Sequence, residues 1–429
     1  LAVLLVAVVA DKDRRFWGPV AGAAFAAAGV VGLLQWQEVA DGGAGLYYSA
    51  MDLEIVRSPM VVMDGFSAFA AIVLGAVGFV GLLASWDLVV KVGKRGPEFV
   101  SLVLLAVAGL HMMAATPNLI VIFLGLETAS IAFYVIAGFV RRQEGSEEAA
   151  LKYFLLGSLA SAMFLYGVAL TFGATGSLSI YGVNSIRDFF ASDIVTQPGI
   201  LLAGMALMVV GLSFKVSAAP FHQWAPDVYQ GAPSAAVGIM AAGVKVAGFA
   251  ALARIFVGGF VSQIDSWAPI IAIIAALSMV IGTVLALVQS DLKRLLAYSG
   301  VAHAGYILTG MVAGIDGIPA MWFYVATYAF MVIGSFAVVS VVSGPDSSAA
   351  PIGEYSGLVR RNGELGWLMT ILILGMSGMP FFAGFVGKLF AFIAAANVGT
   401  GWPVATNGYL WLVVIGALTT VIGFAFYLR

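Results

Sequence analysis

Long apolar stretches alternate with short polar or charged clusters along almost the whole chain. Most stretches hold about 20 residues, the length of a helix that crosses the hydrocarbon core of a bilayer. The pattern predicts thirteen membrane spans, the first of them partial. In chain order the expected spans are residues 1–10, 16–34, 60–84, 99–115, 118–140, 149–173, 198–219, 233–257, 268–289, 294–313, 318–342, 366–396 and 407–428.

Both ends of the chain interrupt this pattern. The chain opens on Leu1 rather than on methionine, and it stops at Arg429 directly after an apolar run. We therefore expect an incomplete copy of a longer protein, in which residues 1–10 end a first span rather than form a signal peptide. The prediction is an all-α polytopic membrane protein of about 13–14 transmembrane helices, with a C-terminal helix missing.

Composition supports a membrane protein. The chain is 62% hydrophobic and 10% charged, with a mean hydropathy of +1.03, whereas a soluble domain is about 45–50% apolar and about 25% charged. A net charge of −2 and the lack of a long basic or acidic run argue against nucleic acid as a partner. With no cysteine in the chain, thiolate metal sites and iron–sulfur clusters are excluded. The three histidines lie far apart, so no metal site is predicted.

Basic residues orient the predicted spans. Only three basic residues lie in even-numbered loops, namely Arg57, Arg187 and Arg254. Thirteen lie in odd-numbered loops: Lys12, Arg14, Arg15, Lys91, Lys94, Arg95, Arg141, Arg142, Lys293, Arg294, Arg360, Arg361 and Arg429. Because cytoplasmic loops carry the excess of lysine and arginine, the odd loops are predicted to be cytoplasmic. The four remaining lysines fall inside spans.

Two spans contain proline where a membrane helix should continue. Pro220 lies in the seventh span and Pro380 in the twelfth. Proline removes a backbone donor and clashes with the preceding turn, so each helix should break there. Both breaks share a Ser-x-x-Pro-Phe core, at 217–221 and 377–381, five spans apart. An odd offset reverses the direction through the membrane, which predicts two inverted five-helix repeats, each containing a broken helix.

This repeat divides the chain into three predicted parts. Residues 1–98 form the N-terminal transmembrane helices. Residues 99–257 form the first inverted repeat, with its broken helix near Pro220. Residues 258–429 form the second, with its broken helix near Pro380.

Five lysine and glutamate residues lie within the predicted spans: Glu127, Lys152, Lys215, Lys245 and Lys388. A charge at the bilayer centre costs about 2.5–3.5 kcal/mol on insertion scales, so such residues need a partner or a use. Buried lysine can lose its proton, whereas arginine stays charged. The choice of lysine therefore predicts groups that gain and lose protons.

A mechanism follows as a hypothesis. Glu127 holds Lys215 in its protonated form, because a nearby opposite charge favours the charged state. Separating the two leaves Lys215 desolvated and without its counter-charge, so its proton passes on. Lys245 is the next station and Lys388 the exit, with water and His303 as the bridge.

Structural interpretations of the lysines stay open beside this one. Lys152 could extend its ammonium to the cytoplasmic face, or could pair with Glu147 or Glu148. Lys245 could be a structural ion-pair partner. Lys293 and Arg294, at the mouth of the tenth span, are interpreted first as determinants of topology.

The histidines have similar alternatives. His111 is interpreted as a packing residue near the end of the fourth span. His222 follows the break at Pro220 and could serve as a gate or as a cap. His303, inside the tenth span, is the best placed of the three to take part in proton transfer.

One stretch, FKVSAAPFHQWAPDVYQGAP (214–233), resembles the signature of the antiporter-like membrane subunits of respiratory complex I, and its DVYQGAP ending is similar to the subunit N branch. The relatives in the L and M branches and in Mrp-type antiporters usually end this signature differently. Further segments with the resemblance are FLGLETASIAFYVIAGF (123–139), EEAALKYFLLGSLASA (147–162), QSDLKRLLAYSGVAHAGY (289–306) and GMPFFAGFVGKLFAF (378–392).

The resemblance implies roles for individual residues. Glu127 matches the membrane glutamate of the family, Lys215 its partner lysine and Lys388 the terminal lysine. The residues that it implies for the proton relay are Glu127, Lys152, Lys215, His222, Lys245, Tyr298, His303 and Lys388.

The resemblance also implies a function. The family couples electron transfer from NADH to quinone, carried out in other subunits with FMN and iron–sulfur clusters, to proton export. This chain would hold no cofactor, and its partners would be the lipid bilayer and other membrane subunits, including antiporter-like neighbours. The expected location is a bacterial plasma membrane. The alternatives are a subunit of an Mrp-type sodium/proton antiporter and a structural membrane subunit.

Overall fold

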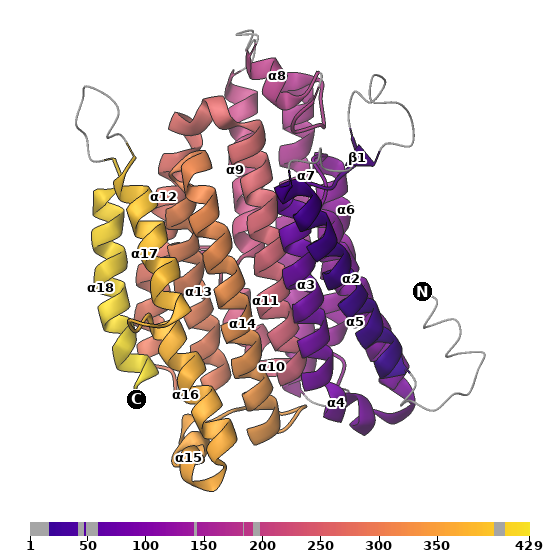
Figure 1. The fold of residues 1–429 in the computed structure, drawn as a ribbon, viewed down its shortest axis with the longest axis vertical. Helices are drawn as coiled ribbons and strands as arrows, with labels where there is room; N and C mark the ends of the chain where they lie inside the picture. Colours follow the sequence, from indigo (N-terminus) through magenta and orange to yellow (C-terminus); the bar gives the residue numbers. More distant parts are fainter. Residues whose placement is uncertain are drawn as a thin grey trace.

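The computed structural model describes residues 17–41, 59–140, 144–182, 184–190, 198–398 and 408–429, and the backbone of 47–48 and 191. Within these residues the chain is a bundle of long, nearly parallel helices (Figure 1). The expected partial span at 1–10 lies outside the described residues. So do the basic residues expected at 12–15, 57 and 141–142.

The first part of the chain contains α2 (Trp17–Ala40), α3 (Gly65–Ala84), α4 (Trp86–Lys91), α5 (Gly96–Ala114), α6 (Leu119–Ala137), α7 (Glu144–Thr175) and α8 (Ile186–Ala191). The middle contains α9 (Pro198–Lys215), α10 (Trp224–Gly231), α11 (Ser234–Leu252) and the π-helix η3 (Ala253–Gly259). The last part contains α12 (Ile264–Leu287), α13 (Leu292–Met311), α14 (Ile318–Val342), α15 (Leu358–Arg361), α16 (Gly363–Ser377), α17 (Ala383–Ala396) and α18 (Leu410–Tyr427). Two short antiparallel strands, β1 (Tyr47–Tyr48) and β2 (Val61–Val62), pair beside α3.

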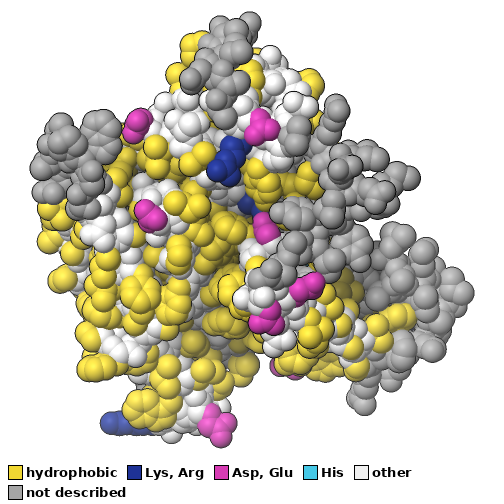
Figure 2. Space-filling view, turned by 45° about the horizontal axis from the view of Figure 1, so that its top comes forward, with side chains coloured by type: hydrophobic (Ala, Val, Ile, Leu, Met, Phe, Trp, Pro, Cys, Tyr) yellow, Lys and Arg dark blue, Asp and Glu magenta, His cyan; other side chains and the backbone are white. Residues whose placement is uncertain are grey.

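The many-helix membrane fold predicted from the sequence is confirmed. Ten helices in the described residues are long and apolar enough to cross a membrane. Helix α13 and the pair α16–α17 lie where the tenth and twelfth spans are expected. Hydrophobic side chains cover most of the flank visible in Figure 2, and charged side chains appear there only in isolated places. The chain is therefore a multi-pass membrane protein.

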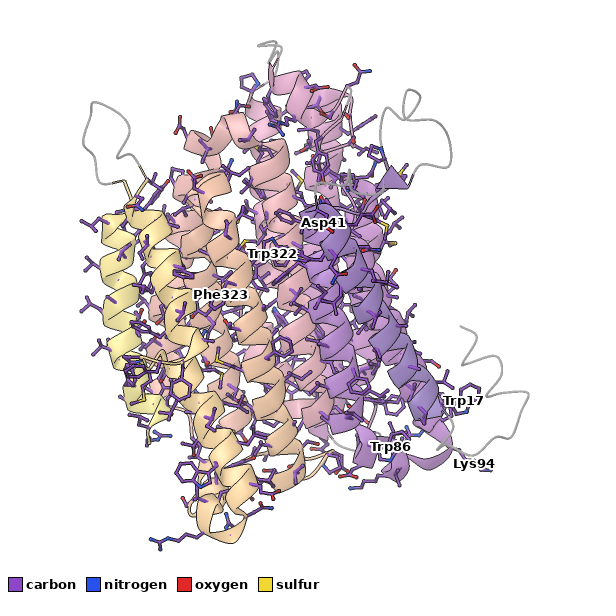
Figure 3. The ribbon with its side chains drawn as sticks, viewed as in Figure 1. Trp17, Asp41, Trp86, Lys94, Trp322 and Phe323 are labelled. Carbon is purple, nitrogen blue, oxygen red and sulfur yellow. The ribbon has the colours of Figure 1, made fainter. Side chains whose placement is uncertain are left out.

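Basic residues gather at one end of the bundle. Helices α4 and α15 and the C-terminus lie at the lower end in Figure 1, and Lys91, Arg360 and Arg361 belong to these helices. Figure 3 places Lys94 at the same end beside Trp17 and Trp86. Basic and tryptophan side chains together are typical of a membrane interface, so this end is the predicted cytoplasmic one.

Helix α11 forms the centre of the bundle. All its residues are buried, and it packs against α3, α5 and α14. Its sequence, SAAVGIMAAGVKVAGFAAL, is rich in alanine and glycine. Small residues allow neighbouring membrane helices to approach closely, so this composition lets α11 be surrounded on every side.

Two helix pairs share the same packing register. A Cβ atom placed on Gly109 of α5 would lie 2.6 Å from the backbone nitrogen of Ala129 in α6. One placed on Gly282 of α12 would lie 2.5 Å from the backbone nitrogen of Ala302 in α13. Each residue of the second pair stands 173 positions after its counterpart in the first. Helices α5–α6 and α12–α13 therefore cross at equivalent points.

The starts of α6 and α13 show the same correspondence. Asn118 caps α6 and forms an isolated β-bridge with Ser179, in the segment after α7. Asp291, again 173 positions later, caps α13 and bridges Pro351, in the segment after α14. These shared details favour the two-repeat organisation, whose boundaries at 99–257 and 258–429 stay a prediction.

We expect Gly109→Ala to weaken the packing of α5 on α6, because the new methyl group would overlap the backbone of α6. A loss of about 1–3 kcal/mol would lower the thermal midpoint of the detergent-purified protein. Gly173→Ala in α7 is the matched control, since a Cβ there meets nothing within 4 Å. Equal midpoints for the two variants would contradict the close crossing.

Candidate functional site

A lysine meets the carbonyl that proline leaves free at the first helix break. In a continuous helix the carbonyl of Val216 would accept the amide hydrogen of residue 220, but Pro220 has none. Lys245 Nζ donates to this carbonyl at 2.7 Å and to the carbonyl of Gly300 at 2.8 Å. The ammonium of α11 thus replaces the missing backbone donor in a region that is buried from solvent.

The second break is built in the same way. The carbonyl of Met376 stands four residues before Pro380, and Lys388 Nζ lies 3.3 Å from it and 2.9 Å from the carbonyl of Ser377. Gly378, with φ of 85°, turns the chain at this point, and the Lys388 side chain packs over it. Lys388 is 4% exposed. Both helix breaks therefore depend on a buried lysine.

His303 stands between these two lysines. Its Nδ1 lies 2.9 Å from the Tyr324 hydroxyl and its Nε2 lies 3.1 Å from the Tyr427 hydroxyl. Tyr328 packs on the imidazole with ring centroids 4.9 Å apart, and Lys245 Nζ lies 5.5 Å from the centre of the Tyr328 ring. The Tyr328 ring therefore lies between His303 and Lys245.

The other side of His303 leads to Lys388. The ring of Tyr306 lies 5.9 Å from the imidazole, and Lys388 Nζ lies 4.6 Å from the centre of that ring. Lysine 245, His303 and Lys388 together with Tyr306 and Tyr328 therefore form one buried row of polar and aromatic groups. The bridging place predicted for His303 agrees with this geometry.

Lys215 occupies the other end of the row. It is the last residue of α9, and the next residue supplies the carbonyl that Lys245 contacts. Its Nζ lies 2.7 Å from Ser130 Oγ and 5.6 Å from the centre of the Tyr153 ring. The four groups Lys215, Lys245, His303 and Lys388 thus follow one another across the middle of the protein.

Glu127, the predicted counter-charge of Lys215, does not share a hydrogen bond with it in the described residues. Among the described residues, Lys215 forms its side-chain hydrogen bond with Ser130, one turn after Glu127 on α6. Glu127 Oε1 is buried and has no hydrogen-bond partner in this part of the chain. The carboxylate is still close enough for its charge to act on Lys215. The structure therefore holds the pair apart.

Lys152 lies outside the row. Its Nζ is 2.6 Å from Glu148 and 2.7 Å from Asp227 of α10, and its side chain is 42% exposed. The second oxygen of Asp227 is 2.7 Å from Arg294 of α13. This cluster ties α7, α10 and α13 together. The pairing of Lys152 with Glu148 agrees with one of the structural alternatives for this lysine.

His222 and Tyr298 lie between the cluster and the break. The centroid of the His222 ring is 6.3 Å from that of Tyr298, which is partly buried on α13. His222 stands two residues after Pro220 and is 9% exposed. Both residues therefore lie beside the first break, but neither contacts a lysine of the row through a hydrogen bond in the described residues.

The burial of Lys293 differs from what we expect of a residue that only determines topology. It is completely buried, and its Nζ donates to the carbonyls of Ala232 and Ser347, each at 2.8 Å. Ala232 is the residue that follows α10, and Ser347 lies in the connection after α14. Its position at the mouth of the tenth span gave no sign of burial, because the connection that covers it is distant in sequence.

The positive-inside count treats Arg254 as a loop residue, but the structure places it inside a helix. It is 3% exposed within η3, and its guanidinium contacts Asp64 with distances of 2.7 and 2.8 Å. Its Nε donates to the carbonyl of Ala114, and its Nη1 contacts the Tyr181 hydroxyl. Three segments that are far apart in sequence therefore meet at this arginine.

Asp64 precedes α3 and caps its first turn through Ser67. Burial alone would raise the pKa of the Asp64 carboxyl, but the hydrogen bonds and charge of Arg254, helped by Ser67, bring the pKa below its ordinary value. The ion pair therefore stabilises the folded state while Asp64 is ionised.

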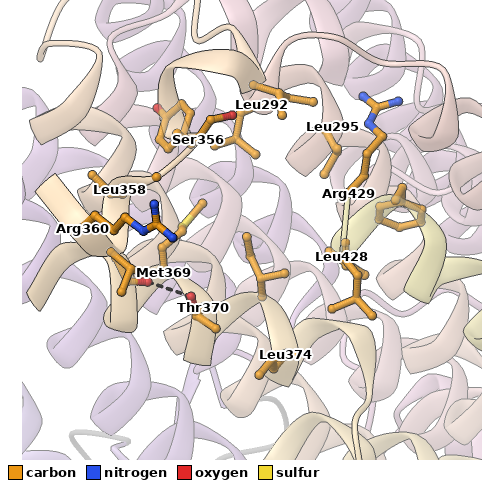
Figure 4. A pocket seen from close by; sticks show the side chains of 18 residues that line it. Leu292, Leu295, Ser356, Leu358, Arg360, Met369, Thr370, Leu374, Leu428 and Arg429 are labelled. Atoms are coloured by element: carbon orange, nitrogen blue, oxygen red, sulfur yellow. Dashed lines mark hydrogen bonds between the residues drawn. The ribbon is translucent and has the colours of Figure 1, made fainter. Parts of the chain in front are cut away.

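A pocket of about 500 Å³ opens beside the row between α13, α16 and α18 (Figure 4). Leu295, Met369 and Leu374 line it, with Arg360 and Arg429 at its margins. Tyr427, which contacts His303, forms part of its wall. The pocket thus reaches from the predicted cytoplasmic end toward the row.

Sequence reasoning found the lysines, His303 and the pairing of Lys152 with Glu148, but it missed the other partners. Ser130 and Asp227 are polar residues, but polarity alone does not reveal which lysine each one binds. Tyr324 and Tyr328, spaced by four residues on one helix, were a usable signal because that spacing places both rings on one face.

Comparison with known proteins assigns the chain to a family. The family model described as "NADH:quinone oxidoreductase/Mrp antiporter, TM" matches residues 116–422. The chain belongs to this family of membrane subunits. The match covers the break elements and every lysine of the row, and it confirms the resemblance found from the sequence motifs.

Several members of the NADH:quinone oxidoreductase/Mrp antiporter family are similar over most of the chain. A protein of Solibacter usitatus named NADH-quinone oxidoreductase subunit N 1 is 41% identical over 371 residues, covering 86% of this chain and 74% of that protein. Subunit N of Trichlorobacter lovleyi is 39% identical, covering 87% and 74%.

Solved structures of the family have the same fold. A chain of respiratory complex I from Thermus thermophilus superposes with a TM-score of 0.78 at 31% identity, covering all of this chain and 86% of that one. A chain of the Mrp complex from Dietzia has a TM-score of 0.83 at 22% identity, covering all of this chain and 76% of that one. The second comparison shows the shared fold alone.

We expect Asp64→Asn to destabilise the protein by about 3–5 kcal/mol at neutral pH, because it leaves the Arg254 charge buried without its counter-charge. The lowered pKa of Asp64 fixes the sign of the pH dependence. The stability from the pair is present above the ordinary carboxyl pKa of 3.8 and is lost as pH falls through the lowered value.

Thermal midpoints of the detergent-purified protein between pH 7 and pH 3 measure this effect. The gap between wild type and Asp64→Asn should be constant above the ordinary pKa of 3.8 and should narrow below it. Asp87→Asn, at an exposed position on α4, is the control and should leave the midpoint unchanged. A gap that stays constant with pH would contradict the assigned role of the ion pair.

Proposed function

We propose that this chain is a proton-translocating membrane subunit of an NADH-quinone oxidoreductase of the complex I type. The observation that carries the proposal is the buried row from Lys215 through Lys245 and His303 to Lys388. Its residues are side chains that can hold and release protons, and it runs through a chain about 40% identical to proteins named subunit N.

The proton path follows the order of the row. Lys245 first passes its own proton toward His303, and the neutral amine then takes the proton of Lys215 across the break, while an N–H of Lys245 keeps its hydrogen bond to the Val216 carbonyl. His303 relays the proton between Lys245 and Lys388, with Tyr328 and Tyr306 flanking it on the two sides. Water would connect the lysines with His303, because Tyr328 and Tyr306 stand between them with their ring faces toward the ammonium groups.

Glu127 is the proposed control element of this path. Its side chain is only partly buried, while Lys215 is 3% exposed. A carboxylate in that position can respond to a charge in a neighbouring subunit and pass the effect to Lys215. The driving change would then come from outside the chain, as expected for a subunit that has no redox chemistry of its own.

The other implied residues have supporting roles in this proposal. His222 and Tyr298 flank the first break on the predicted cytoplasmic side and would admit protons toward Lys215. Lys152 and Asp227 hold α10 in place beside them. The placement of Lys152 outside the row makes it a positioning residue rather than a station for protons.

The proposal also assigns the chain its partners. Electron transfer from NADH to quinone, with FMN and iron–sulfur clusters, would take place in other subunits of the complex. Antiporter-like membrane subunits would be the lateral neighbours in a bacterial plasma membrane. Among the described residues, no group of histidine, aspartate and glutamate side chains could hold a metal ion.

An Mrp-type sodium/proton antiporter would use the same broken helices, and NADH dependence separates the two functions. Proton pumping by the purified complex in vesicles should require NADH and stop with an inhibitor of the quinone site. Pumping driven by a sodium gradient without NADH would favour the antiporter instead.

We expect Lys215→Met to lower NADH-driven proton pumping of the reconstituted complex by at least about tenfold, because methionine fills the same space but cannot carry a proton. Acidification of proteoliposomes by the intact complex is the measurement. Lys91→Met is the control, since Lys91 is 58% exposed and pairs with Asp346 at the surface. Normal pumping by Lys215→Met in an assembled complex would refute the proposed function.

We expect His303→Leu to slow pumping because it removes the group that connects the Lys245 and Lys388 ends of the row. The loss should be smaller than for Lys215→Met if water takes over part of the transfer. His111→Leu in α5 is the matched control, because His111 lies outside the row. If the two histidine variants pump equally well, the continuous row is wrong.

A further inference from the structure

We propose that the Ser130 hydroxyl is a second docking position for the Lys215 ammonium, in competition with Glu127. Lys215 would then have two states, one paired with Glu127 and one separated from it on Ser130. The serine would set the balance between these two states, which we call the switch. This inference rests on the proposed function, because it assigns a positioning residue to the same proton path.

The hydrogen bonds of Ser130 make it an acceptor for the lysine. Ser130 is completely buried on α6, and its hydroxyl hydrogen is donated to the carbonyl of Leu126. Its oxygen lies 2.7 Å from Lys215 Nζ. Because the hydroxyl hydrogen is already used, the oxygen can only accept, and a protonated lysine is the donor that it receives.

Glu127 is the competing acceptor. It precedes Ser130 by three residues, so both side chains leave the helix on neighbouring parts of one face. Its buried Oε1 has no hydrogen-bond partner in the described chain, although its charge acts on Lys215. A buried carboxylate oxygen without a partner is costly, and a direct contact with the nearby Lys215 ammonium would remove that cost.

In the part of the chain that the structure describes, Ser130 is the one side chain that accepts a hydrogen bond from the Lys215 ammonium. The Tyr153 ring lies 5.6 Å from Nζ and attracts the cation through its face. Two oxygens on α6, one neutral and one charged, therefore compete for one donor.

The shared register of the two helix pairs supports a special role for this position. The offset of 173 residues that relates Gly109 to Gly282 and Asn118 to Asp291 also relates Ser130 to His303. His303 stands between two buried lysines, and Ser130 holds a third. The same place in both halves thus carries a polar side chain next to a lysine of the row.

Removing the hydroxyl should shift the switch toward the pair. In Ser130→Ala the separated ammonium has lost its acceptor, so Glu127 becomes its only strong partner. The separated state becomes about tenfold less populated, and NADH-driven pumping slows by about the same factor. Ser130→Thr keeps the hydroxyl and should pump at nearly the wild-type rate.

The experiment uses the intact complex in proteoliposomes, with assembly checked for every variant. Ser130→Cys is nearly isosteric but a weak acceptor, so it should be slow like Ser130→Ala even if the alanine variant assembles poorly. Ser335→Ala is the matched control, because Ser335 is equally buried and donates to the carbonyl four residues earlier, yet contacts no lysine.

The decisive comparison places Ser130→Ala in a Glu127→Asp background. The shorter carboxylate weakens the competing pair, so it should restore part of the pumping that Ser130→Ala loses. A serine that only supports packing would cause the same fold-loss in both backgrounds, and that result would overturn the inference. Wild-type pumping by both Ser130→Ala and Ser130→Cys would overturn it as well.

Lys215→Met in the same complex separates the two levels of the proposal. If it pumps normally, the proposed function fails. If it is inactive while the Ser130 variants are normal, only the role of Ser130 fails.

Discussion

The structure depends on one constraint: a carbonyl that proline deprives of its helical donor must find another donor inside the membrane. At both breaks that donor is a lysine ammonium, from Lys245 at Val216 and from Lys388 at Met376. An unsatisfied carbonyl and a lone ammonium are each costly in a low-dielectric interior, and each removes the cost of the other. The break and the lysine are therefore one structural feature, and neither would be stable alone.

This constraint explains why the proton path lies where it does. The two breaks fix lysines at mid-depth on either side of His303, and the central helix α11 carries one of them among small residues. Tyrosines fill the remaining space and offer hydroxyl groups without adding charge. A row of titratable groups thus follows from the need to satisfy backbone carbonyls, and proton transfer makes use of groups that the fold already requires.

Much of this could be predicted from the sequence, because long apolar runs, proline and isolated lysines act locally. The spans, both breaks and the lysines of the row were found in that way. Contacts between distant segments could not be found, since neither the Asp64–Arg254 pair nor the connection that buries Lys293 has a local signal. The hydrogen bond from Lys215 to Ser130 had no signal either, because charge points to Glu127, whereas the geometry of α6 presents Ser130.

The central claim is that Lys215 and Lys388 belong to one path in series. The most direct measurement is the number of protons translocated per NADH oxidised, in complexes that carry a methionine at Lys215, at Lys388 or at both. A serial path predicts the same reduced ratio in all three complexes, because one interruption already stops the flow through this subunit. A normal ratio in one single variant, or a further decrease in the double variant, would contradict the account.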